Sequence, residues 1–358
     1  MDNTISDRMR YFLENYDVAF TYVQDKNSTE YIIDPVDKVC RFCGRRYPDV
    51  RFKKKAHAIS ESLGNKECVL RNECDDCNEK FGDMLEDQLC KYLGVSRTVS
   101  QIAGKHGVPT YRSKDKKNRV EFDPDLGIII KEVEGSDFTE LKENRIIIHA
   151  VRDKYTPLAV YKAFVKMSLS LIDYKYMPHF IETTSWIREP SQLITRFHDL
   201  PQYGMVIERF VPGPKPLPLR ATGFIRKNDC IKLPYYQFYL EFANYSYQMV
   251  IPCPVKDQGL EEINILRVPG TDEQIELSEW ASLLENAISI NPDEYMSDFR
   301  KQFGMPVVHV RNFTSAIPIN DEPLDISLGY EALERHNESI GLKVEDVILE
   351  EKNRNKES

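Results

Sequence analysis

The spacing of apolar residues predicts two helices in the first hundred positions. Between residues 6 and 24 an apolar side chain recurs every three or four positions, which predicts an amphipathic helix over 6–24. From Phe81 onward, Leu85, Leu89 and Leu93 follow at intervals of four and predict a second helix with one apolar stripe. The sequence therefore predicts one helix before the cysteine-rich segment and one directly after it.

Short apolar runs and alternation dominate the sequence after the first third. The triplets 128–130 and 146–148 consist of isoleucine and predict short buried strands. Alternating apolar and polar residues predict several strands between 204 and 252, and a later apolar stripe predicts a helix over 277–288. Helices and strands together make an α+β fold class the expectation.

A core helix is expected to begin at Thr156, where a capping residue precedes Pro157. The following residues to Leu171 are apolar on most sides, which is typical of a helix inside a core. Lys162 and Lys166, four positions apart, are interpreted as the solvent edge of this helix, with phosphate binding as the alternative.

The composition, 41% hydrophobic and 29% charged in 358 residues, is that of a soluble globular protein. No run of about 18 apolar residues predicts a membrane span, and the polar N-terminus does not resemble a secretory signal. We therefore expect a cytoplasmic protein, in which cysteines serve as metal ligands or core residues.

Charge is distributed unevenly along the chain. Residues 40–120 contain 18 Lys and Arg against 11 Asp and Glu, a net charge of +7. The whole chain has a net charge of −9, so the residues outside this range together carry −16. This asymmetry indicates that the N-terminal part meets a polyanion and the rest does not.

Four cysteines have the spacing of a zinc site. Cys40 and Cys43 form one C-x2-C pair, and Cys74 and Cys77 form a second pair further along the chain. Two such pairs are the usual way to present four thiolates to Zn²⁺. The other four cysteines (Cys68, Cys90, Cys230 and Cys253) lack a paired spacing and are expected to be ordinary buried residues.

The segment enclosed by these pairs resembles the HNH, or ββα-metal, nucleases that carry a four-cysteine zinc site. The resemblance covers about residues 38–95 and rests on His57-Ala58-Ile59, the Leu63-Gly64 turn and Asn78 directly after the last cysteine. It implies His57 as the general base, Asn78 as a ligand of a catalytic Mg²⁺ or Mn²⁺, and DNA as the substrate.

Two positions depart from the family pattern. Ala56 stands where many members have an acidic metal ligand, and Val69 stands where many have an asparagine. Four residues are candidates for these missing roles, and the sequence does not choose among them: Glu61, Asn65, Asn72 and Asp83. Exposed basic residues are expected to contact the phosphate backbone, namely Lys53, Lys54, Lys55, Lys105 and Arg112.

We expect four regions: a lead-in helix over 1–37, the nuclease with its basic extension over 38–120, a mixed α/β domain over 121–341, and a charged, disordered tail over 342–358. The outline resembles bacterial anti-phage effectors, in which a C-terminal domain senses a nucleotide or docks a partner. The third region is accordingly expected to regulate or oligomerise the nuclease. A catalytically silent zinc module that binds nucleic acid remains the alternative, favoured by Ala56.

Overall fold

The computed structural model describes residues 5–25, 27–142, 145–189, 203–210, 217–229, 232–260, 265–268 and 307–329. The fold mixes helices and strands, as the sequence predicts. The helix predicted over 277–288 and the charged tail over 342–358 lie outside these residues. Within the described ranges, no helix is long and apolar enough to cross a bilayer.

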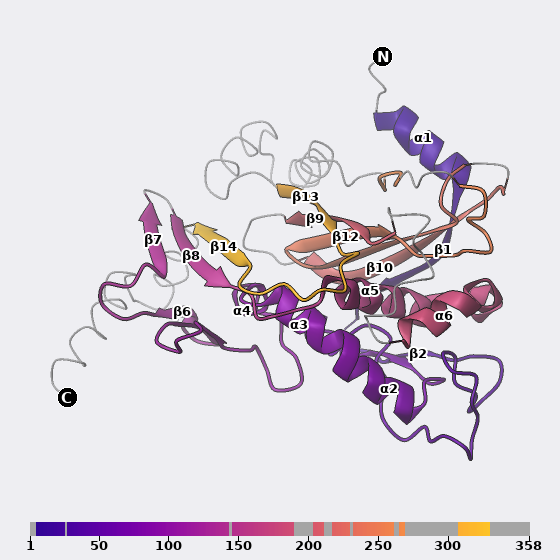
Figure 1. The fold of residues 1–358 in the computed structure, drawn as a ribbon, viewed down its shortest axis with the longest axis horizontal. Helices are drawn as coiled ribbons and strands as arrows, with labels where there is room; N and C mark the ends of the chain where they lie inside the picture. Colours follow the sequence, from indigo (N-terminus) through magenta and orange to yellow (C-terminus); the bar gives the residue numbers. More distant parts are fainter. Residues whose placement is uncertain are drawn as a thin grey trace.

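A six-stranded antiparallel sheet forms the centre of the molecule, in the order β1-β10-β11-β12-β9-β13 (Figure 1). Its strands are β1 (Tyr16–Val23), β9 (Met205–Phe210), β10 (Leu217–Arg226), β11 (Tyr236–Ala243), β12 (Tyr245–Val250) and β13 (Val307–Asn312). The four strands from β9 to β12 confirm the strands predicted between 204 and 252. Every residue of β11 and β12 is buried, because both strands lie inside the sheet.

The single helix predicted over 6–24 is wrong in its second half. Helix α1 covers Ile5–Asn15, and the chain then continues as β1, which pairs antiparallel with β10. The apolar residues of this stretch satisfy a helical period and a period of two equally well. The distant strand β10 decides between them, because β1 supplies its hydrogen-bonding partners.

Helix α5 (Pro157–Leu171) lies between the central sheet and a second helical layer (Figure 1). Toward the sheet, the rings of Phe164 and Tyr247 lie 5.0 Å apart, and the Ser168 hydroxyl donates to the Tyr236 hydroxyl at 2.8 Å. All fifteen residues of α5 are buried, which confirms the predicted core helix. The solvent-edge interpretation of its two lysines is wrong, because both are enclosed between layers.

The second layer is a helical rod built from α2 (Asp75–Phe81), the π-helical turn η2 (Gly82–Glu86) and α3 (Asp87–Leu93). The apolar stripe predicted from the sequence is buried along its whole length: Phe81, Leu85, Leu89 and Leu93. A short helix, α4 (Ser96–Val99), follows. Beyond α5 follow the 3-10 helix η3 (Tyr174–Phe180) and helix α6 (Ile181–Ile187), which lies beside α5 (Figure 1).

Two three-stranded antiparallel sheets lie to one side of the central sheet. One contains β4 (Tyr111–Arg112), β5 (Arg119–Asp123) and β6 (Gly127–Lys131); the other contains β7 (Thr139–Lys142), β8 (Arg145–Val151) and β14 (Pro323–Gly329). The isoleucine triplets form strands in β6 and β8, as predicted. Those of β6 are half-buried, whereas Ile146 and Ile148 of β8 are buried.

The largest apolar core contains residues of the cysteine-rich segment, the rod, α5 and the central sheet. Phe81 of the rod, Phe164 of α5 and Phe238 of the sheet all belong to it. The region boundaries expected at residues 37 and 120 stay a prediction. The packing shows that the cysteine-rich segment shares its core with the residues after 120, hereafter the C-terminal part.

Candidate nuclease site and its metal-binding cysteines

Four cysteines converge at one end of the rod. Their sulfur atoms all lie within 4.8 Å of one another: Cys40, Cys43, Cys74 and Cys77. The first pair sits in a tight turn in which Gly44, at a φ of 69°, donates its amide to the Cys40 carbonyl. In the second pair, Cys74 is the N-cap of α2 and Cys77 lies in its first turn.

The donor set fits a structural zinc ion. Tetrahedral Zn²⁺ with Zn–S bonds of about 2.3 Å places its sulfurs about 3.8 Å apart. The sulfurs of Cys43 and Cys74, which come from different pairs, are 3.8 Å apart. Cys68, Cys90 and Cys253 lie outside the cluster, as predicted, and Cys230 lies outside the described residues.

Between the cysteine pairs, the chain forms a ββα arrangement that ends in α2. Residues 56–58 run antiparallel to β3 (Cys68–Leu70), with hydrogen bonds of 3.1 Å from the Ala58 amide to the Cys68 carbonyl and 2.9 Å from the Leu70 amide to the Ala56 carbonyl. On its other edge, β3 pairs with β2 (Glu30–Ile32). A 3-10 turn, η1 (Glu61–Leu63), follows the first segment and ends at Gly64, whose φ is 89°.

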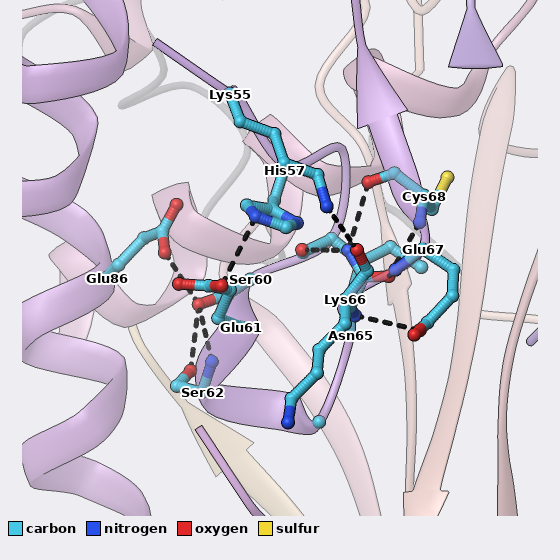
Figure 2. Close-up of polar contacts among 12 residues, drawn as sticks. Lys55, His57, Ser60, Glu61, Ser62, Asn65, Lys66, Glu67, Cys68 and Glu86 are labelled. Atoms are coloured by element: carbon cyan, nitrogen blue, oxygen red, sulfur yellow. Dashed lines mark hydrogen bonds and ion pairs between the residues drawn. The ribbon is translucent and has the colours of Figure 1, made fainter. Parts of the chain in front are cut away.

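His57 lies on the first segment of this arrangement, facing η1 (Figure 2). Its Nε2 is 3.3 Å from Oε1 of Glu61, and its side chain is 12% exposed. Its Nδ1 is buried without a hydrogen-bond partner among the described residues. A proton on Nε2 is therefore stabilised by Glu61, which leaves Nδ1 as the basic atom of the neutral ring.

Burial lowers the pKa of His57, and the nearby carboxylates of Glu61 and Glu86 oppose this shift. Burial removes water from around the ring and so disfavours the charged imidazolium relative to the neutral imidazole. The neutral ring that a general base requires is thus the stable form at physiological pH.

The hydrogen bonds of two candidates for the missing metal-ligand roles hold the backbone. Asn65 donates to the Ile59 carbonyl and accepts from the Cys68 amide, at 2.6 and 2.9 Å. Asn72 accepts from the Asp34 amide at 2.9 Å and donates to two further carbonyls. Both amide groups are therefore engaged in loop structure.

The remaining candidates are carboxylates. Glu61 is half-exposed beside His57, and Asp83 is exposed on the rod. A third carboxylate, that of Glu86, was not among the residues predicted from the sequence. It accepts a hydrogen bond from the Ser60 hydroxyl at 2.7 Å and lies close to His57 (Figure 2). Glu86 lies in η2, eight residues after Asn78, and an acidic residue about two helical turns beyond the predicted metal ligand is the sequence signal that could have found it.

The other predicted site residues surround the start of α2 or lie further along the chain. Asn78 is half-buried in α2, and within the described segments no hydrogen bond or ion pair joins its side chain to His57. Lys53, Lys54 and Lys55 are exposed, and the amides of the first two each donate to Asp75 at 2.8 Å. Lys105 and Arg112 are also exposed, in a loop and in β4.

Residues 40–93 match the HNH endonuclease family. This segment of the chain is thus an HNH module with a four-cysteine metal site, and the resemblance expected from the sequence is confirmed. An HNH module supports a role in cleaving or binding nucleic acid. Neither a curated protein nor a solved structure matches the chain.

Proposed function

We propose that this protein is a metal-dependent endonuclease that hydrolyses phosphodiester bonds in DNA, with His57 as the general base. The observation that carries the proposal is the placement of the His57 imidazole beside Glu61, on a ββα arrangement that four cysteines hold at one end. The HNH match of the same segment supports it.

In the proposed reaction, Nδ1 of His57 takes the proton from the attacking water as the new P–O bond forms. Glu61 stabilises the proton on Nε2 and thus keeps Nδ1 unprotonated before the attack. Nδ1 is buried, so the surroundings of His57 have to rearrange on substrate binding before this atom can contact the attacking water. The bond between phosphorus and the 3′ oxygen breaks, and this oxygen takes a proton from solvent, which leaves 5′-phosphate and 3′-hydroxyl ends.

Asn78, with Glu61, Asp83 or Glu86, would hold the catalytic Mg²⁺ or Mn²⁺. A divalent ion bound there would neutralise the charge that develops on the phosphate and the leaving oxygen. Exposed Lys53, Lys54 and Lys55 would contact the phosphates on either side of the cleaved bond.

The test incubates the full chain with supercoiled plasmid in EDTA, Mg²⁺ or Mn²⁺. Nicking or linearisation is expected only with metal, and His57→Ala is expected to slow it by roughly a hundredfold to ten-thousandfold. His106→Ala is the matched control, because His106 is an exposed histidine of the same region. Equal cleavage by His57→Ala and the unmodified chain would contradict the role of His57.

A silent zinc module that binds nucleic acid is the second candidate. Ala56, 1% exposed, stands directly before His57 and offers no metal ligand. A DNA gel shift without cleavage in any of the metals would favour this function over the nuclease.

We further propose that the C-terminal part controls the nuclease in the cytoplasm, in response to a nucleotide or a protein partner, and that this control serves anti-phage defence. The excess of acidic over basic residues after residue 120 supports a role other than DNA binding for that part. Cleavage and size exclusion of the full chain, with and without cyclic and linear nucleotides, test this. If the cleavage rate and the oligomeric state stay unchanged with every nucleotide, the proposal that a nucleotide controls the nuclease is contradicted.

A further inference from the structure

Lys166 of helix α5 reaches from the C-terminal part into the HNH module. Its Nζ donates to the main-chain carbonyl of His57 at 2.8 Å and lies 3.0 Å from Oε2 of Glu73. The side chains of Lys166 and Glu73 are 2% and 0% exposed. The ammonium group is thus held in the core between two partners that both belong to the nuclease segment.

The bond to His57 follows from the alternation of the strand. The Ala56 carbonyl and the Ala58 amide point to β3, where they are paired. The carbonyl of His57, between them, points to the opposite side, where α5 lies. Lys166 therefore satisfies a carbonyl that points away from β3, and that carbonyl belongs to the residue carrying the proposed base.

Packing alone does not require a buried ion pair here. Removing two charges from water costs free energy that their attraction does not always return, and apolar side chains of similar volume often serve the fold equally well. A lysine at this position does what an apolar side chain cannot, because it donates a hydrogen bond to a particular carbonyl.

Lys162, one helical turn earlier, provides an internal comparison. It is also buried, but its Nζ donates to the carbonyls of Trp186 and Glu189, at 3.1 and 3.2 Å. Both lysines cost the fold a buried charge, and only Lys166 contacts the segment that carries His57.

We infer that Lys166 is a positioning residue for His57: it fixes the main chain under the imidazole and makes helix α5 part of the nuclease active site. The inference rests on the proposed function of His57. It assigns the C-terminal part a structural share in catalysis that does not depend on any activating ligand.

The test compares the full chain with the double variant Lys166→Met/Glu73→Leu and with Lys162→Met. The double variant removes the buried lysine and its acidic partner together, so neither is left buried alone, and it is expected to fold and to keep one zinc per chain. DNA affinity is expected to stay within about twofold, while the single-turnover cleavage rate at saturating DNA falls by roughly tenfold to a hundredfold. Lys162→Met is expected to cleave at the unmodified rate.

Two results would overturn the inference: a folded, zinc-loaded double variant that cleaves at the unmodified rate, or an equal loss of rate in Lys162→Met. Should the double variant fail to fold, Lys166→Arg is compared with Lys162→Arg, since both keep the charge. A slower rate in Lys166→Arg alone supports the positioning role, and equal rates overturn it.

A second readout separates this inference from the proposed function. If the unmodified chain cleaves no DNA in any metal, the nuclease proposal fails, and the ring signals of His57 in a long-range ¹H–¹⁵N spectrum still report its placement. A shift of these signals in the double variant but not in Lys162→Met supports the positioning role. Unchanged signals in both variants overturn it.

Discussion

The guanidinium group of Arg41 donates to the main-chain carbonyl of Ile172 at 2.9 Å, across 131 positions of sequence. The same Nη1 also donates to the carbonyls of Leu169 and Ser170, at 2.9 and 2.8 Å. These carbonyls lie at the C-terminal end of α5, where a helix leaves its last acceptors without partners. Because Arg41 stands between Cys40 and Cys43, it attaches the first cysteine pair directly to the core helix.

Arg41→Met is expected to lower the free energy of unfolding by about 3 to 5 kcal/mol. The substitution leaves Asp34 buried without its cation and uncaps the end of α5. Urea denaturation followed by circular dichroism measures the change. Lys91→Met is the control, because Lys91 pairs with Asp87 at the surface and is expected to change stability by about 0.5 kcal/mol or less. Similar losses in both variants would show that Arg41 has no capping role.

One zinc ion per chain is expected to be bound, and removing it should unfold the cysteine-rich segment. Replacement with Co²⁺ is expected to give the intense thiolate-to-metal absorption of a four-sulfur site. Cys74→Ala should lose this absorption, whereas Cys68→Ala should keep it, because Cys68 is buried outside the cluster. An unchanged spectrum in Cys74→Ala would contradict the assignment of the ligands.

Lys162 is expected to make stability depend on pH in the alkaline range. Burial lowers the pKa of Lys162 to about 8, against 10.5 for a free lysine. Between these values the unfolded chain binds more protons than the folded chain, so this residue's contribution to stability rises with pH. The 2.5-unit difference between those two values corresponds to roughly 3 kcal/mol.

Urea unfolding of the full chain and of Lys162→Met at several pH values between 7.5 and 10.5 measures this dependence. The unmodified chain should gain stability relative to Lys162→Met as the pH rises. A constant difference between the two proteins would show that the pKa of Lys162 is ordinary.

DNA binding is expected to weaken with salt, and Lys53→Gln should reduce this dependence. Each lost phosphate contact lowers the slope of log affinity against log salt by about 0.9. Lys54→Gln should have a smaller effect, because Lys54 pairs with Glu79 at 2.8 Å. Lys227→Gln is the control, since Lys227 lies at the end of β10 beside α1 and pairs with Asp17. An unchanged slope in Lys53→Gln would remove Lys53 from the DNA-binding surface.

Sequence patterns predicted a structural element correctly where residues close in sequence determine that element. The cysteine spacing, the apolar stripe of the rod and the start of α5 at Pro157 all depend on residues within one or two turns. The second half of the predicted 6–24 helix was wrong for the opposite reason. Its partner, β10, lies some two hundred positions away.

Chemically, the sequence by itself determined the HNH segment: four thiolates for a metal, with His57 as a base candidate and exposed lysines beside it. Only the tertiary structure decided what surrounds His57. Glu86 of the rod lies near it, and Lys166 of α5, more than one hundred positions away in sequence, donates to its carbonyl. From the sequence alone, a lysine on an apolar helix is interpreted as lying at the solvent edge of that helix. Burying its charge is favourable only beside partner groups, and the fold brings these from distant parts of the sequence.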